Sequence, residues 1–308
     1  MNISDELQII LSLTGFTQEK LARELGVSFP TVNSWVRKRS EPHPKKKGVV
    51  DAYFRRLTGS HEIPAGPLNA KKAILRGMRE KGPDVLNLLR TRRDILDQFC
   101  LSLTYNTNRI EGSTLTEPET AAILFDNVAL PHKTLVEHME VKNHQAAFLH
   151  LLGLLHKGTI IDRELILKLH SMLMNGIQAD AGCYRRHGVR IVGSHVPTAN
   201  FLKIDALMND VIDEIAQPQE DVISHVARIH SRFEQVHPFS DGNGRIGRLL
   251  IQAMLLKEGY PPAVIPQKRK RHYLAALNRS QIKNEFLDLE EFLCDSILTV
   301  SPWISSAS

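Results

Sequence analysis

Residues 237–248 read HPFSDGNGRIGR and lie between two strongly patterned segments. The preceding segment, VISHVARIHSRFEQV (222–236), has apolar residues at spacings of three and four, which predicts an amphipathic helix. The following segment, RIGRLLIQAMLLKEG, is apolar almost all round, which predicts a buried helix. Pro238 ends the first helix, so His237 is expected at its C-terminal end. The sequence therefore predicts two core helices joined by a glycine-rich turn.

The residue types in this turn favour binding of a polyphosphate. A glycine-rich turn that leads into a helix offers outward-pointing backbone N–H groups and the positive end of the helix dipole. Arg245 and Arg248 share one face of that helix, and each guanidinium can donate two hydrogen bonds to a phosphate. Asp241 would repel a phosphate unless a cation stood between them, which implies Mg²⁺. His237 is then a proton acceptor beside a magnesium polyphosphate.

Each feature alone also has an ordinary structural explanation, because turns are often Gly-Asn-Gly and helix ends often carry histidine. Their combination in twelve residues favours the chemical interpretation. The sequence contains no GxxxxGK(S/T) motif, so this phosphate site is not a P-loop.

Composition excludes several classes of protein. The chain has 308 residues, 42% hydrophobic and 24% charged, as in a globular protein. No apolar run approaches the roughly 20 residues that span a bilayer, and the first residues, MNISDELQIILSL, carry acids where a secretory signal carries basic residues. Three widely separated cysteines fit reduced thiols. We expect a cytoplasmic protein without membrane association; the net charge of +5 permits a polyanionic partner.

Residues 1–58 predict a helix-turn-helix-like domain. In TQEKLARELGVSFPTVNSWVRKR, Thr17 and Ser28 can cap two successive helices, and Gly26 ends the first. A basic end follows the second helix, as in helix-turn-helix proteins of the Cro/repressor type. Residues 1–60 hold ten Lys/Arg against six Asp/Glu. The residues expected to contact DNA, if this domain binds it, are Ser28, Thr31, Asn33, Ser34, Arg37 and Lys38.

The remainder is predicted to be helical apart from one segment. Residues 59–94 are expected to form a linker and connecting helices, and residues 95–300 a helical domain. The exception is RRHGVRIVGSHVPTA (185–199), where a short alternating run flanked by glycines predicts a β-hairpin. The predicted fold class is all-α with one small hairpin.

The stretch HPFSDGNGRIGR resembles the signature of the Fic (Fido) family, HPFx(D/E)GNGRxxR, at every defined position. The resemblance extends through EVKNHQAAF, LHSMLM, YRRHGVRIVGSHVPTA and LLIQAMLLKEGYPPAVI, and covers roughly residues 95 to 300. Fic proteins mostly transfer AMP from ATP to a hydroxyl of a target protein. The resemblance thus implies ATP as donor, Mg²⁺, a protein target bearing Ser, Thr or Tyr, and release of pyrophosphate.

The resemblance also assigns roles to residues. His237 would be the general base and Asp241 would hold Mg²⁺. The α- and β-phosphates would meet residues 242–244, with Arg248 at the β-phosphate and Arg245 at the γ-phosphate. The full nucleotide-binding set expected from the resemblance is Gly242, Asn243, Gly244, Arg245, Gly247, Arg248 and Tyr273, the last near adenine.

The predicted hairpin falls where the family carries a flap on which the target peptide adds as a strand, an interaction made mainly through backbone hydrogen bonds. A plain structural hairpin is the alternative. The expected flap residues are Val189, Arg190, Ile191 and Val192.

A second match concerns regulation. TNRIEG (107–112) resembles the family's inhibitory motif, (S/T)xxxE(G/N), with Thr107, Glu111 and Gly112 at the defined positions. Its place before the HPF motif is the arrangement in which inhibition is intramolecular. We expect the Glu111 carboxylate to reach Arg245 and occupy the γ-phosphate position.

Three other functions stay open from the sequence. The chain could be a DNA-binding regulator whose Fic part senses nucleotide, an enzyme that removes AMP, or one that transfers another phosphate-linked group such as UMP or phosphocholine. Family members often dimerise, so a homodimer is a further expectation.

Overall fold

The computed structural model describes residues 1–58, 66–156, 158–191, 196–217 and 219–305. The chain divides into two compact units, one formed by residues 1–83 with 294–308 and the other by residues 84–293. The sequence analysis placed boundaries near residues 58 and 94, whereas the division falls after Pro83 and again after Leu293. Each unit is helical, and no β-strand occurs in the described ranges.

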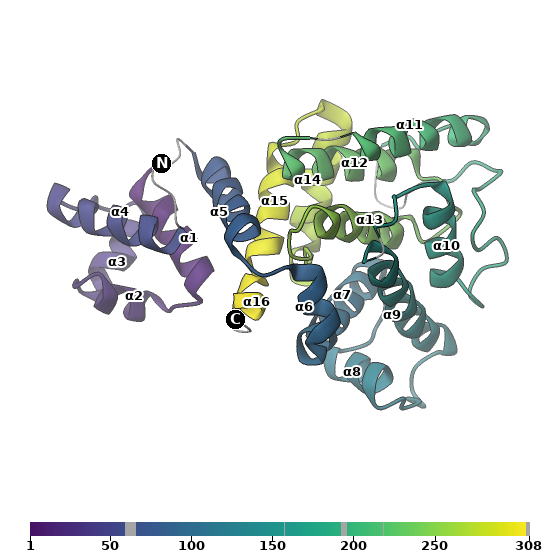
Figure 1. Cartoon of the computed structure of the whole chain (residues 1–308), viewed down its shortest axis with the longest axis horizontal. Coiled ribbons are helices and arrows are strands. Elements are labelled where there is room, and N and C mark those ends of the chain that lie inside the picture. The colour runs from purple at the N-terminus through teal and green to yellow at the C-terminus, as the bar shows by residue number, and fades with distance from the viewer. Residues whose placement is uncertain (59–65, 157, 192–195, 218, 306–308) are drawn as a thin grey trace. The chain divides into compact units, whose positions relative to one another are not determined.

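The N-terminal unit contains the predicted pair of capped helices. Its helices are α1 (Ile3–Thr14), α2 (Gln18–Glu24), α3 (Phe29–Val36), α4 (Pro44–Thr58), α5 (Pro67–Lys81) and α16 (Ser301–Ser305), labelled in Figure 1. The side chain of Thr17 accepts a hydrogen bond from the Lys20 amide, and that of Ser28 accepts one from the Thr31 amide, as N-caps do. Leu21, Val32 and Trp35 are buried, so α2 and α3 pack with the inner faces that the periodicity predicted.

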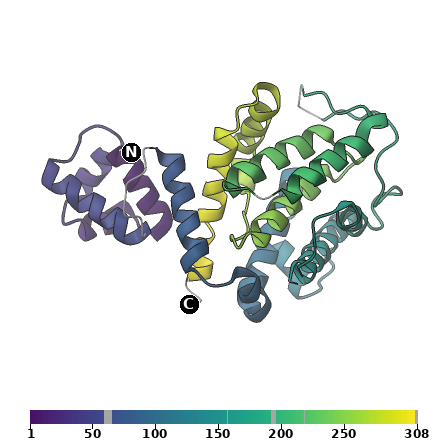
Figure 2. The ribbon, with the colours of Figure 1, turned by 45° about the horizontal axis from the view of Figure 1, so that its top comes forward.

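The second unit is built around α13 (Figures 1 and 2). Its elements are α6 (Val85–Thr91), α7 (Arg93–Glu111), α8 (Glu117–Phe125), α9 (Leu135–Leu155), α10 (Arg163–Leu173), η1 (Phe201–Lys203), α11 (Ile204–Ala216), α12 (Val222–Val236), α13 (Asn243–Lys257), η2 (Gln267–Arg269) and α14 (Lys270–Lys283). The boundary after Leu293 falls within helix α15 (Leu287–Leu298). The helices that contact α13 are α7, α9, α10 and α12.

The two core helices have the predicted positions. Helix α12 spans the whole segment that was read as amphipathic, and its apolar residues are buried. Every residue of α13 from Arg245 to Leu256 is buried, which confirms a helix surrounded on all sides. Because α13 is enclosed, Arg245 and Arg248 are buried, and their charges need acidic or polar partners in the interior.

The predicted hairpin does not form strands in the described part of residues 185–199. The chain there is irregular, with the Thr198 hydroxyl donating to the Val189 carbonyl at 2.8 Å. The predicted turn, together with Val192, lies outside the described residues. Glycine and proline at Gly188 and Pro197 interrupt any regular ladder on the described flanks.

Candidate active site

The turn between α12 and α13 is held by its own asparagine. The Asn243 side chain accepts from the Phe239 amide and donates to the Phe239 carbonyl, both at 2.8 Å. The Phe239 ring, fully buried, stacks on His170 with ring centroids 3.7 Å apart. The Asn243 side chain is thereby buried against the backbone of its own turn, so its backbone N–H is the group expected to meet a phosphate. This is a narrower role than the sequence suggested.

His170 supports the same turn from α10. Its Nδ1 accepts from the Gly182 amide at 2.8 Å, which leaves Nε2 to donate to the Asp241 carbonyl at 3.0 Å. Burial lowers the pKa of His170, and a neutral ring is the form that these two bonds require. Sequence analysis missed this residue, because a histidine on an amphipathic helix carries no distinguishing signal.

The first turn of α13 has the backbone geometry that the predicted anion site requires. Gly242 precedes it with φ of 79°, a left-handed conformation that glycine adopts without strain, and provides no capping side chain. The first intrahelical bond runs from the Ile246 amide to the Gly242 carbonyl, so the amides of residues 243–245 precede the hydrogen-bonded ladder. A Cβ on Gly244 would meet the carboxylate of Glu111 and the Arg248 guanidinium, so only glycine leaves this space open.

His237 faces a cavity of about 680 Å³ that Gly244, Arg248 and Glu111 also line. Its Nδ1 lies 3.2 Å from the Glu234 carbonyl. A carbonyl can only accept, so Nδ1 carries the proton and Nε2 is the basic nitrogen. Burial is the main cause that lowers the pKa of His237, with Arg185 adding to it. The ring is therefore neutral near pH 7, as a proton acceptor must be.

The backbone of His237 is held in an unusual conformation by Arg185. His237 has φ of 51° and ψ of 60°, a left-handed geometry that is uncommon outside glycine. The Arg185 Nε donates to the His237 carbonyl at 2.7 Å, and the Arg185 amide donates to the Pro238 carbonyl at 2.9 Å. The other carbonyls that its guanidinium reaches belong to His187, Val236 and Ala199. Arg185 is only 2% exposed and was missed by sequence analysis, where it was one arginine among several in a glycine-rich segment.

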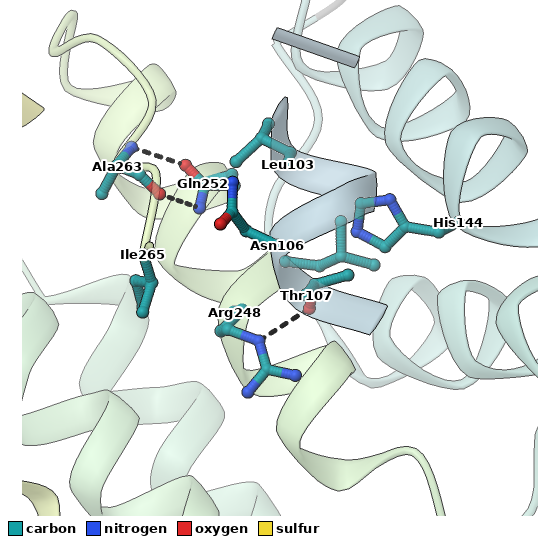
Figure 3. A pocket seen from close by; sticks show the side chains of 9 residues that line it. Leu103, Asn106, Thr107, His144, Arg248, Gln252, Ala263 and Ile265 are labelled. Atoms are coloured by element: carbon teal, nitrogen blue, oxygen red, sulfur yellow. Dashed lines mark hydrogen bonds between the residues drawn. The ribbon is translucent and has the colours of Figure 1, made fainter. Parts of the chain in front are cut away.

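Arg248 is buried and bound to the inhibitory motif. Its Nε donates to the Thr107 hydroxyl at 2.7 Å, as Figure 3 shows, and an Nη donates to the Glu111 carboxylate. The sequence prediction that Glu111 reaches Arg245 is wrong, because α7 runs beside Arg248. Burial acts to raise the pKa of Glu111, but the charges of Arg248, Arg245 and Lys270 and the hydrogen bond from Arg248 together outweigh it, so the net pKa is lowered. Glu111 is therefore ionised. Gly112 ends α7 with φ of 109°.

Arg245 has different acidic partners. Its guanidinium bonds Glu140 of α9 at 2.7 Å and Asp241 at 3.3 Å, with only 3% of the side chain exposed. Glu140, which the sequence analysis missed, has its pKa raised by burial against the opposing charge of Arg245. The carboxylates of Glu140 and Asp241 thus bind the Arg245 guanidinium, which the sequence had predicted to bind Glu111.

Asp241 is the one exposed carboxylate of the turn, with 59% of its side chain accessible. Its Oδ1 accepts from the Gly242 amide at 2.6 Å. No cluster of three or more potential metal ligands occurs in the part of the chain that the structure describes. A single accessible carboxylate fits a Mg²⁺ whose other ligands are water and phosphate oxygens, which is how this ion is commonly held with nucleotides.

Gly247 and Tyr273, both predicted to contact the nucleotide, pack against other residues of the protein interior. A Cβ on Gly247 would approach Glu234 to 2.5 Å and His230 to 3.0 Å, so this glycine permits close packing of α13 on α12. Tyr273 lines the cavity, yet its hydroxyl contacts His230 Nε2 at 2.6 Å and its side chain is buried. Both residues support the wall of the cavity, and an adenine contact by Tyr273 stays a prediction.

Of the flap residues, Ile191 lines the cavity, Arg190 is exposed, and the carbonyl of Val189 holds Thr198. In the N-terminal unit, several of the residues proposed to contact DNA bond within the unit. The Ser28 and Thr31 hydroxyls lie 2.7 Å apart, Asn33 donates to Gln18 at 3.0 Å, and the Ser34 hydroxyl lies 2.7 Å from that of Ser40. Arg37 and Lys38 are exposed after the end of α3.

Comparison with known proteins agrees with this architecture. Residues 160–255 match the family model described as Fic/DOC family. The chain is 33% identical over 251 residues to a protein adenylyltransferase Fic of Nematostella vectensis, covering 79% of this chain and 53% of that protein. It is 29% identical over 222 residues to one of Drosophila willistoni, covering 70% and 43%. The chain therefore spans about half, or less, of the length of these relatives.

Solved structures share the fold. A Fic domain containing signaling protein from Bacteroides thetaiotaomicron superposes with a TM-score of 0.64 at 22% identity, covering 78% of this chain and 96% of that one. Fic-1 of C. elegans gives 0.66 at 24% identity, covering 86% and 78%. The helical core is thus a Fic-type fold. The chain carries a Fic/DOC family domain, which confirms the family resemblance seen in the sequence.

The hydrogen bonds from the buried Arg185 to backbone carbonyls give a prediction about stability. Arg185→Leu should lower the free energy of unfolding by at least about 2 kcal/mol, because buried carbonyls lose their donor. Urea denaturation followed by circular dichroism measures the change. Arg186→Leu is the matched control, since Arg186 is the exposed neighbour. An equal decrease in the free energy of unfolding in the two variants would contradict this stabilising role of Arg185.

Proposed function

We propose that the chain is a protein adenylyltransferase that moves AMP from ATP to a Ser, Thr or Tyr hydroxyl of a target protein. The observation that carries this proposal is the basic Nε2 of His237 in a cavity that also holds the open first turn of α13 and Arg248. The relatives named protein adenylyltransferase Fic support the same activity.

The proposed reaction uses the groups that line this cavity. His237 Nε2 takes the proton of the target hydroxyl, and the freed oxygen attacks the α-phosphorus of ATP. The bond from that phosphorus to the oxygen bridging to the β-phosphate breaks, and pyrophosphate leaves with its electron pair. The amides of the first turn of α13 and the arginine guanidinium groups stabilise the charge that develops on the phosphates. The proton on His237 then passes to solvent.

The metal would be held at one residue. Asp241 is the accessible carboxylate of the turn, and Mg²⁺ bound there would neutralise phosphate charge. Its Oδ2 now faces Arg245, so a nucleotide would compete for that guanidinium.

Glu111 acts as a brake in this proposal. Its carboxylate accepts a hydrogen bond from the Arg248 guanidinium and lies next to Gly244. A phosphate bound at the first turn of α13 would need the same place. ATP that enters with Glu111 in place meets a negative charge instead of a positive one. Transfer therefore requires that Glu111 move away from Arg248.

The first test compares wild type, Glu111→Gly and Glu111→Gly/His237→Ala after incubation with Mg²⁺ and ATP labelled in its α-phosphate. Glu111→Gly should label itself strongly, and loss of the base should lower that rate roughly 10²- to 10⁴-fold. The label on protein is quantified after denaturing electrophoresis.

Equal labelling of wild type and Glu111→Gly would exclude the brake. If no variant is labelled although ATP binds, the AMP-transfer proposal is wrong. Repeating the assay with other labelled nucleotide donors and with AMP-modified protein then distinguishes the other donors and AMP removal.

The pH dependence follows from the lowered pKa of His237. Neutral His237 is the active form, so transfer falls as pH drops through the folded-state pKa, which lies below the ordinary value near 6.5. The negative charge of Glu111 raises this pKa. In Glu111→Gly that charge is gone, so the rate of transfer should fall only at a still lower pH. NMR titration of the His237 ring in that variant measures the midpoint, and a midpoint at or above about 6.5 would contradict the assignment.

We propose DNA binding as a second function of the N-terminal unit. The supporting observation is the exposed basic run Arg37 to Arg39 directly after the capped helix α3. A basic end on a second helix that follows a short turn is typical of DNA-contacting helices.

A mixed-sequence duplex should bind the full chain with an affinity that falls steeply as salt rises, because phosphate contacts release counterions. Fluorescence anisotropy measures this, and Arg37→Ala/Lys38→Ala should weaken binding and reduce the salt slope. Arg271→Ala, an exposed arginine of the other unit, is the control. No binding at low salt would rule out this function.

A further inference from the structure

The C-terminal end of α7 carries the inhibitory glutamate, and its last carbonyls lack intrahelical partners, as at every helix end. The turn after it is closed by a bond from the Ser113 amide to the Asn108 carbonyl at 3.0 Å. The left-handed Gly112 makes that turn possible. The position of Glu111 therefore depends on what holds this last turn.

Two bonds from the segment that begins α14 hold it. The Lys270 ammonium donates to the carbonyl of Ile110, the residue before Glu111, at 2.5 Å. The Gln267 amide donates to Asn106 Oδ1 at 2.8 Å. A lysine that donates to the last carbonyls also interacts favourably with the negative end of the helix dipole. Lys270 thus acts on the same turn as Glu111 from outside the inhibitory motif.

Lys270 is also a wall of the active-site cavity. It lines the cavity that His237, Gly244 and Arg248 share, and its charge is one of those that lower the pKa of Glu111. An ammonium on a flexible stem can exchange one acceptor for another. A phosphate brought into this cavity competes with the neutral carbonyl of Ile110 for the Lys270 ammonium, and its negative charge makes it the stronger acceptor.

We propose that Lys270 is a latch on the inhibitory helix that a polyphosphate opens. With the cavity free of phosphate, the ammonium holds the carbonyl of Ile110 and so keeps Glu111 on Arg248. When a polyphosphate binds, the ammonium turns to it and the last turn of α7 loosens. Lys270 is a positioning residue in this scheme, and the scheme rests on the proposed function only for the identity of the natural phosphate.

A ligand that binds more tightly when the last turn of α7 is loosened shifts the protein toward that loosened state. By thermodynamic linkage, loosening that turn raises the affinity for the ligand by the same factor. Release of the brake is thereby coupled to the arrival of its substrate. This coupling needs no second site, because one ammonium faces both acceptors.

Hydrogen exchange of the full chain tests the latch without any activity. In Lys270→Met, the amides of residues 111–113 should exchange about tenfold faster, the factor expected for loss of one charge-assisted bond. Lys270→Arg should restore most of the protection, because it keeps a donor and a charge. Lys268→Met is the matched control, since Lys268 is exposed two residues away, and it should exchange like wild type. Wild-type exchange in Lys270→Met, or equal acceleration in Lys268→Met, overturns the latch.

Opening by phosphate is tested with sodium tripolyphosphate on Glu111→Gln, where the competing carboxylate charge is gone. Titration should speed exchange of residues 111–113 in this variant and leave Glu111→Gln/Lys270→Met unchanged. Equal responses in the two variants, protection instead of acceleration, or no response would overturn the opening step.

The transfer assay then separates this inference from the proposed function. Lys270→Met should raise self-labelling in the wild-type background at saturating ATP. In Glu111→Gly, where no inhibition remains to be released, the same substitution removes only a phosphate contact, so labelling should not rise and a fall is expected. Labelling that rises equally in both backgrounds would overturn the inference. If no variant is labelled while exchange behaves as stated, the proposed function fails and the latch stands.

Discussion

The burial of Arg248 is the constraint on which the active site depends. Its side chain lies on a helix enclosed by neighbours, and a buried guanidinium without an anion is strongly destabilising. Thr107 and Glu111 supply the hydroxyl and carboxylate that this cation needs. The contact of Glu111 with Arg248 is thus the ordinary charge compensation of a buried arginine. Any state in which Glu111 leaves must offer Arg248 another anion, and in the proposed function that anion is a phosphate of the nucleotide.

A separate set of buried polar contacts holds the turn before α13. His237 keeps a left-handed backbone that costs roughly 1–3 kcal/mol in a non-glycine residue. Arg185, Asn243 and His170 offset this cost by binding the carbonyls and amides around it. His237 is therefore positioned by a set of polar contacts that need no substrate, which is what the proposed role as general base requires.

Different acidic residues bind the two arginines of α13. Arg245 is bound by Glu140 of α9 and by Asp241, whereas Arg248 is bound by Glu111 of α7. One turn of α13 separates the two guanidinium groups, yet they depend on different neighbours. A movement of the end of α7 can therefore release one arginine and leave the other in place, which makes a selective brake physically possible.

The sequence alone determined the local features. Periodicity placed α12 and α13, capping residues placed α2 and α3, and the density of HPFSDGNGRIGR pointed to the family, because each of these depends on neighbouring residues in the chain. Tertiary structure decided which partners meet. Glu111 reaches Arg248 and not Arg245, Arg185 and Lys270 hold the turn and the helix end, and residues 189–191 form no strand. These depend on how helices distant in sequence cross, and side-chain reach across a packed interface is not encoded in spacing along the chain.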